Sequence, residues 1–223
     1  MLTHVRRRTI LVAALGGALL ATLGVTVARS QAAAARELPV SPSWEQGNFA
    51  HLAPGSTYRA GLVSPTPTVT PTDAGWSGSQ VVTHLSGKVR YESTVFIGRH
   101  GVITLTSGPA MTLTPAAAIA APLSRIASWN FAPYDRPTPV RHWRIAGRPA
   151  LYFDATTPPP GGWSLVGSNP PEVRIEHDLS FRMAALSVRG KTVVIVIQAP
   201  VADFAAFLPG AVRLLASLRF PAS

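Results

Sequence analysis

The sequence contains no cysteine, and only 13% of its 223 residues carry a charge. Without cysteine, a disulfide framework, a cysteine-ligated zinc or iron–sulfur site, a cysteine nucleophile and a lipid anchor on an N-terminal cysteine are all excluded. Acidic residues are scarce as well: ten stand against 20 lysines and arginines, so the formal net charge is +10. Because 47% of the residues are apolar, general disorder is excluded too.

Signatures of catalysis and of phosphate binding are also missing. The chain has no G-x-S-x-G, no HExxH, no P-loop and no G-x-G-x-x-G after a strand. None of its six histidines pairs with another at the H-x-x-x-H spacing of a zinc site. The basic residues of the exported part sit singly rather than in a basic helix or stripe, which argues against nucleic acid as a partner. The sequence therefore predicts a protein that is not an enzyme and carries no metal or cofactor.

The N-terminus has the form of an export signal. Basic residues at 6–8 precede an uncharged, largely apolar run at 9–28, which Arg29 ends. A run of roughly 20 apolar residues can span a bilayer as a helix. The spacings Ser30-x-Ala32 and Ala32-x-Ala34, however, place small residues at the two positions that a signal peptidase reads. Cleavage near residue 33 and retention of 9–28 as a single-span anchor therefore both stay open.

Orientation follows from the position of the arginines. Basic residues ahead of the apolar run keep the N-terminus in the cytoplasm, so everything after about residue 30 is expected to be exported. Cleavage would remove four of the 20 basic residues and leave a net charge of +6. The predicted location is extracytoplasmic, either secreted or anchored in the membrane by one span.

Three parts are expected along the chain. Residues 1–35 form the signal peptide or signal anchor, residues 36–57 a linker punctuated by proline and glycine, and residues 58–220 one exported domain. A domain of this size buries a core without covalent staples. Within it, residues 64–73 alternate threonine and proline, which predicts an edge strand. An O-glycosylated stalk is the alternative for that stretch.

Alternation of apolar and polar residues predicts a series of strands after this stretch. They are expected at 80–85, 88–97, 102–107, 141–145, 150–155, 172–178, 181–188 and 192–198. The segment TVVIVI at 192–197 is apolar on both faces and predicts a central strand covered on both sides.

Two helices complete the predicted elements. The first follows Thr114, an N-cap, and Pro115, with Pro122 expected to divide it into two pieces. The second closes the chain and is expected to be interrupted at Pro209. Their apolar stripes recur at spacings of three and four: Ile119, Leu123, Ile126 and Trp129 in the first, and Phe204, Leu208, Ala211, Leu215 and Leu218 in the second. The predicted class is α+β, an antiparallel β-sheet flanked by helices and preceded by an N-terminal hydrophobic helix.

Four short motifs together carry a family resemblance. They are Leu52-x-Pro54-Gly55-x-x-Tyr58, the pair Gly75-Trp76, the stretch from Arg144 to Leu151, and the tail from Asp203 to Phe220. This combination resembles uncharacterised secreted proteins and lipoproteins of actinobacteria and other high-GC bacteria, several of which are similar to the PsbP-like α/β sandwich. The resemblance implies that fold and an envelope location, and it carries no catalytic residue across. The absence of cysteine departs from the lipoprotein members.

Three tryptophans are the candidate ligand-binding residues. Trp76 and Trp163 lie in glycine-flanked connections expected to be exposed, and Trp129 ends the first helix. The connection at 156–171 is long enough to act as a lid over an apolar ligand or a protein partner. The alternative is that these rings only fill the ends of the core.

The predicted function is that of a non-enzymatic envelope protein that binds a lipophilic small molecule or an envelope protein. One alternative is a structural accessory domain tethered to the membrane by residues 9–28. Another is a hydrolase or transferase in which two of His142, Asp154, His177 and Asp178 converge, although Asp154 is expected on a solvated face. The oligomeric state leaves no trace in the sequence.

Overall fold

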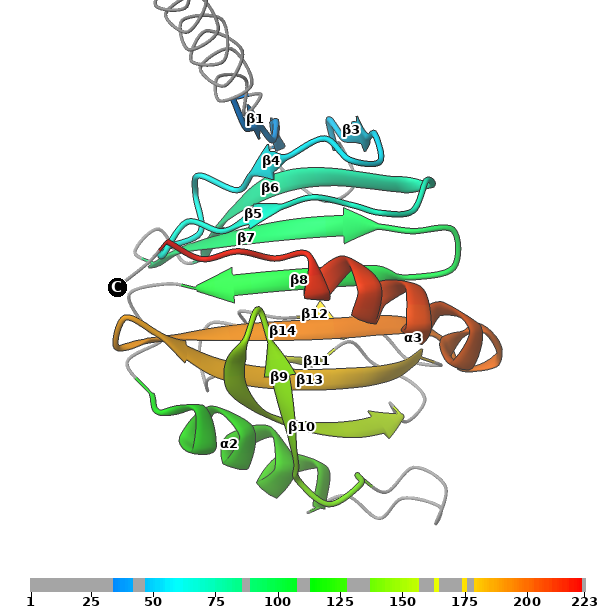
Figure 1. The fold of residues 1–223 in the computed structure, drawn as a ribbon. Coiled ribbons are helices and arrows are strands. Elements are labelled where there is room, and N and C mark those ends of the chain that lie inside the picture. The colour runs from blue at the N-terminus through cyan, green and yellow to red at the C-terminus, as the bar shows by residue number, and fades with distance from the viewer. Residues whose placement is uncertain are drawn as a thin grey trace, which may run out of the picture. The chain divides into compact units, whose positions relative to one another are not determined.

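The computed structural model shows how most of the chain after residue 33 is arranged (Figure 1). It describes residues 34–41, 47–85, 89–107, 113–127, 137–156, 163–164, 174–175 and 179–221. From Ala35 onward these residues belong to one compact unit. The helix expected at 9–28 lies outside the described residues, and so does nearly all of the expected export segment at 1–35.

One sheet of nine strands dominates the described residues. Eight of them lie in the order β2-β6-β7-β8-β14-β13-β10-β9, and β3 pairs separately with β6. Their bounds are β2 Val40–Ser41, β3 Ala50–Leu52, β6 Trp76–Leu85, β7 Val89–Ile97, β8 Val102–Ser107, β9 Arg141–Ile145, β10 Arg148–Thr156, β13 Leu179–Val188 and β14 Lys191–Pro200. Each strand expected between residues 80 and 107, 141 and 155, and 181 and 198 is present.

β14 lies in the middle of this sheet, between β8 and β13. Its residues from Val193 to Ile197 are at most 1% exposed, which confirms the predicted central strand. Successive side chains of a strand point to opposite faces. Val193, Ile195 and Ile197 accordingly belong to one hydrophobic cluster, and Val194 and Val196 belong to another.

A helix packs on each face of the sheet. α3 (Val201–Ala216) lies over β14 and β13, where Phe207, Ala211, Leu214 and Leu215 join the first cluster (Figure 1). We call this the α3 face. α2 (Pro115–Ala127) covers the other face, the α2 face, where Ala118, Ile119 and Ile126 contribute to the second cluster. Among the described residues, neither helix has the length and apolar character needed to cross a membrane.

Both helices run through a proline, so the predicted division of each helix was wrong. α2 contains Pro122 and α3 contains Pro209. A proline inside a helix removes one hydrogen bond and costs roughly 3 kcal/mol. On either side of Pro209, Phe207 and Ala211 are both buried against the sheet. Burial of the flanking turns thus offsets the lost hydrogen bond.

The sheet arrangement is mixed, which corrects the expectation of a purely antiparallel sheet. β2 pairs with β6 in parallel. In a separate three-stranded sheet, β1 (Arg36–Glu37) pairs in parallel with β4 (Tyr58–Arg59), and β5 (Thr68–Val69) completes it. Parallel neighbours require a connection of a dozen or more residues, which the segment between β1 and β4 supplies. β5 covers two residues of the Thr–Pro stretch expected as an edge strand and is the last strand of this small sheet, although Thr68 also forms an antiparallel bridge with Arg219 on its other side.

Within the stretch expected as a linker, residues 36–57, the described residues 36–41 and 47–57 are part of the fold. It contains β1, β2 and β3, and its side chains Leu38 and Leu52 are at most 1% exposed. The backbone is held as well: Gln80 Nε2 donates to the carbonyl oxygen of Leu38 at 2.7 Å. The described prolines and glycines of this stretch, Pro39, Gly47, Pro54 and Gly55, lie between short strands.

The long connection after β10 contains further structure. β11 (Trp163–Ser164) pairs antiparallel with β12 (Arg174–Ile175) in a two-stranded sheet. β12 falls within the strand expected at 172–178. Of the expected lid at 156–171, Thr156 ends β10, and residues 157–162 and 165–171 lie outside the described residues.

Candidate functional site

The tryptophan predicted in an exposed connection before β6 is in fact a core residue. Trp76 begins β6 and is 5% exposed, and its ring centroid lies 5.7 Å from that of Phe207 in α3. Gly75 turns the chain with a φ of +88°, and the ring then fills the space between sheet and helix. Trp129 and the side chain of Trp163 lie outside the described residues, so a ligand-binding role for these tryptophans stays a prediction.

Two of the residues considered for hydrolysis do not converge. His142 pairs with Leu151 across β9 and β10, and Leu151 and Asp154 point to opposite faces of β10. His177 and Asp178 lie outside the described residues. Within the described part of the chain, no group of three or more His, Asp or Glu residues could hold a metal ion.

The candidate site lies on the β9–β10 hairpin, residues 141–156. Its two turn residues, Ala146 and Gly147, have φ angles of 52° and 75°. Positive φ at both positions of a two-residue loop defines the tight turn that matches the twist of a hairpin. Ile145 and Arg148 pair directly beside the turn.

Among the described residues, no strand pairs with the outer side of β9, because β9 is the last strand in the order. In a two-residue hairpin, the pair beside the turn exchanges both backbone hydrogen bonds, and such pairs alternate with pairs that exchange none. Trp143 therefore bonds to Ala150, whereas His142 and Arg144 do not bond to β10. The partner of Arg144 is Pro149, which has no N–H to give. The backbone N–H and C=O groups of His142 and Arg144 thus point outward.

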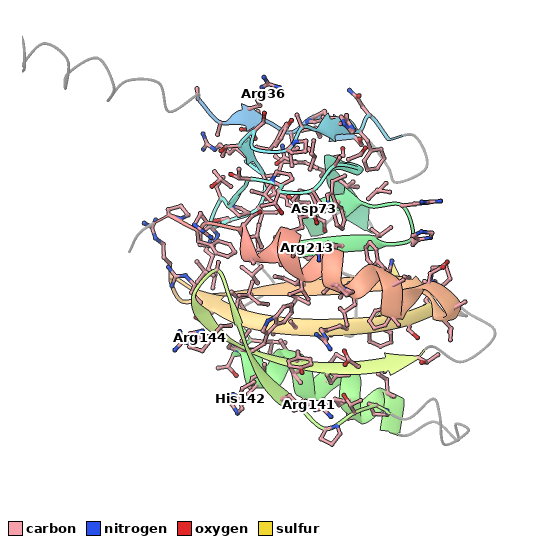
Figure 2. The ribbon with its side chains drawn as sticks, turned by 45° about the vertical axis from the view of Figure 1, so that its right-hand side comes forward. Arg36, Asp73, Arg141, His142, Arg144 and Arg213 are labelled. Carbon is pink, nitrogen blue, oxygen red and sulfur yellow. The ribbon has the colours of Figure 1, made fainter. Side chains whose placement is uncertain are left out.

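The side chains along this edge are basic, and no acidic residue of the described part of the chain pairs with them. Arg141, His142 and Arg144 are exposed, and Arg148 is half-buried. None of the four forms an ion pair with a described acidic residue, although Arg144 Nη1 donates to the carbonyl oxygen of Gly147 at 2.9 Å. Figure 2 shows Arg141, His142 and Arg144 together on this hairpin, apart from the Asp73–Arg213 ion pair beside α3. Exposed positive charge of this kind attracts anionic partners.

An ion pair and two aromatic rings fix the hairpin to the rest of the sheet. Arg182 of β13 donates from Nε and Nη2 to the two carboxylate oxygens of Asp154, at 2.7 and 2.9 Å. Its guanidinium carbon lies 4.3 Å from the ring centroid of Tyr152 and 5.6 Å from that of Trp143. The two rings meet edge to face at 5.9 Å. A bidentate pair with cation–π contacts holds the hairpin in one geometry.

The charge of Arg182 is internally compensated. Burial is the largest influence on its pKa and lowers it, but the hydrogen bond and charge of Asp154, with a contribution from Tyr152, raise the pKa above its usual value. Arg182 therefore stays charged over the whole pH range in which proteins are ordinarily folded. Because Asp154 balances it, the surplus positive charge of the hairpin comes from the edge residues.

This cluster is the part of the site that the sequence did not reveal. Asp154 was expected on a solvated face, yet its side chain is 25% exposed and fully engaged by Arg182, whose side chain is 15% exposed. The strand alternation places Tyr152 and Asp154 on one face and was available from the sequence. Asp154 pairs with Arg182 of β13, 28 residues further along the chain. No local sequence pattern predicts a strand register over that distance.

Among known proteins, two solved structures are weakly similar to this chain. No protein-family model matches the chain, and no curated protein is significantly similar to it. The solution structure of cyanobacterial PsbP (CyanoP) from Synechocystis sp. PCC 6803 is 12% identical, covers 79% of this chain and 99% of its own, and has a TM-score of 0.41. LpqN, involved in cell envelope biogenesis of Mycobacterium tuberculosis, is 11% identical, covers 78% and 90%, and has a TM-score of 0.35. Both TM-scores are too low to establish a shared fold, so the PsbP-like sandwich stays a prediction.

Proposed function

We propose that this chain is a non-enzymatic binding module of the cell envelope, and that it engages a protein partner through the β9–β10 hairpin. The observation that carries the proposal is the open edge of β9, flanked by basic side chains that no described acidic residue neutralises. The expected export segment at residues 1–35 supports the extracytoplasmic location.

A polypeptide suits this edge better than a small anion does. His142 and Arg144 offer backbone N–H and C=O groups at the spacing of a strand, and only another backbone can use both kinds of group in alternation. The edge is also preorganised, because the bidentate Arg182–Asp154 pair fixes β10 to β13. A surface that is already ordered loses little conformational entropy when it binds.

Site-specific photo-crosslinking in the native host tests the proposal. A photoreactive amino acid replaces His142 at the edge of β9, and the matched control carries it at Arg189, an exposed residue of the β13–β14 turn. We expect a protein adduct of defined mass from position 142 and none from position 189. Absence of any adduct at 142, or the same adducts from both positions, would overturn the proposal.

A further inference from the structure

We propose that the partner contributes an extended acidic segment, which adds to the open edge of β9 as a further strand of the main sheet. This inference rests on the proposed function and names the chemistry of the partner.

The two ends of the sheet differ in how well they are protected. At one end β2 and the three-residue β3 pair with different parts of β6, and short edge strands are a common defence against unwanted pairing. At the other end β9 spans five residues, and no described strand pairs with the outward groups of His142 and Arg144. β9 is therefore the edge that offers an incoming strand two consecutive sites of hydrogen bonding.

The positive charges on this edge favour an acidic strand as the binding partner. Two copies of β9 placed side by side would bring arginines close together, and like charges opposite one another destabilise a strand pair. A second copy of this chain is therefore disfavoured. His142 and Arg144 lie on the same face of β9, so acidic side chains opposite them on an added strand would meet both. The exposed side chain of Val140, 43% accessible, offers an apolar contact at the start of the edge.

An anionic lipid surface explains fewer of these features. Lipid headgroups would attract the arginines but would leave the strand-spaced backbone groups of β9 unused. Trp143, the aromatic residue of this strand, packs on Tyr152 and Arg182 and does not project as membrane-interface tryptophans do. Hydrogen-bonding geometry and packing both favour a polypeptide.

Peptide binding to the full chain, purified in detergent, tests the inference. The probe is a fluorescent, end-capped peptide of alternating glutamate and threonine, and its matched control alternates lysine and threonine. We expect the acidic peptide to raise its fluorescence anisotropy on binding and the basic one to remain free. The affinity of the acidic peptide should fall as salt is added, because salt screens exposed charges.

Two pairs of variants separate strand addition from simple charge attraction. His142→Pro removes an outward N–H while leaving the ladder to β10 intact, and His142→Ala loses only the side chain. We expect the proline variant to bind the acidic peptide roughly tenfold more weakly than the alanine variant, an effect of one lost hydrogen-bonding site. Arg144→Glu should weaken binding by roughly tenfold as well, whereas Arg189→Glu at the other turn should leave it unchanged. Thermal unfolding of each variant confirms that it is folded.

Each contrary outcome has a distinct meaning. Equal binding by His142→Pro and His142→Ala would overturn strand addition, because charge alone would then hold the peptide. Binding to phosphatidylglycerol vesicles without binding to the acidic peptide would overturn the polypeptide partner in favour of a membrane surface. A crosslinked partner at position 142 with no peptide binding would reject the extended acidic segment and leave the proposed function standing.

Discussion

The β13–β14 and β9–β10 hairpins share one turn geometry and differ in their surroundings. The φ angles are 52° and 74° at Arg189 and Gly190, and 52° and 75° at Ala146 and Gly147. β13 and β14 lie within the sheet, between a helix on each face, whereas β9 ends the sheet and exposes three of its five residues. The turn therefore makes the hairpin, while the neighbouring elements decide whether it becomes framework or accessible surface.

The largest expected effect is a core truncation in the framework hairpin. Ile195 is 0% exposed in the middle of β14, so Ile195→Ala should lower the free energy of unfolding by about 2–5 kcal/mol. Val140→Ala, which removes an exposed apolar side chain beside β9, should change it by less than about 0.5 kcal/mol. Urea unfolding of both variants measures the difference. Similar losses of unfolding free energy at the two positions would show that β14 is no more important to the stability of the core than the residues beside β9.

The next effect concerns the pair that joins the two hairpins. Arg182→Ala leaves Asp154 half-buried without its partner, which should lower the free energy of unfolding by about 1–3 kcal/mol. The double variant Arg182→Met with Asp154→Asn removes both charges and should recover part of that loss. Urea unfolding of the single and double variants checks this. If the double variant is as unstable as the sum of its parts, the two residues do not act as a pair.

A smaller effect should be the same in both hairpins. Ala146 and Arg189 hold positive φ, which asparagine adopts more readily than either residue does. Ala146→Asn and Arg189→Asn should therefore each stabilise the protein by about 0.5–1 kcal/mol, as expected for substitutions that suit the native backbone. Thermal melts compare the two gains. A gain confined to one hairpin would mean that its surroundings, and not its turn, control the stability of the loop.

The smallest expected effect on stability comes from the basic edge itself. Arg144→Gln and Arg148→Gln should each change the free energy of unfolding by less than about 0.5 kcal/mol, because neither residue has an ion pair among the described residues. The same variants should weaken binding of the acidic peptide. A clear loss of stability in either variant would indicate that these arginines support the fold.

Elements defined by local pattern were predictable from the sequence. The doubly apolar run of β14 and the N-cap at Thr114, whose hydroxyl oxygen accepts from the backbone N–H of Ala117 at 3.3 Å, both appear as expected. The predictions were wrong where the structure depends on packing between segments that are far apart in the sequence. Prolines 122 and 209 remain inside helices because tertiary packing outweighs their local cost.

The candidate site was only partly accessible from the sequence. The strands at 141–145 and 150–155 were predicted, but their basic residues were interpreted as isolated charges. They gather at a sheet edge only through the strand order, which places β9 last. The Arg182–Asp154 pair depends on register between strands far apart in sequence. Trp76, singled out as an exposed ring, is instead buried by α3, an element that begins more than a hundred residues later.

Amide hydrogen exchange, resolved by residue with NMR, tests the binding role of the β9 edge most directly. In the free full chain, the N–H groups of His142 and Arg144 should exchange fast, and that of Trp143, bonded to β10, should exchange slowly. Addition of the acidic peptide should slow His142 and Arg144 and leave Trp143 unchanged. If His142 and Arg144 were already as protected as Trp143, or if the peptide left them fast, the edge would not be an open binding surface.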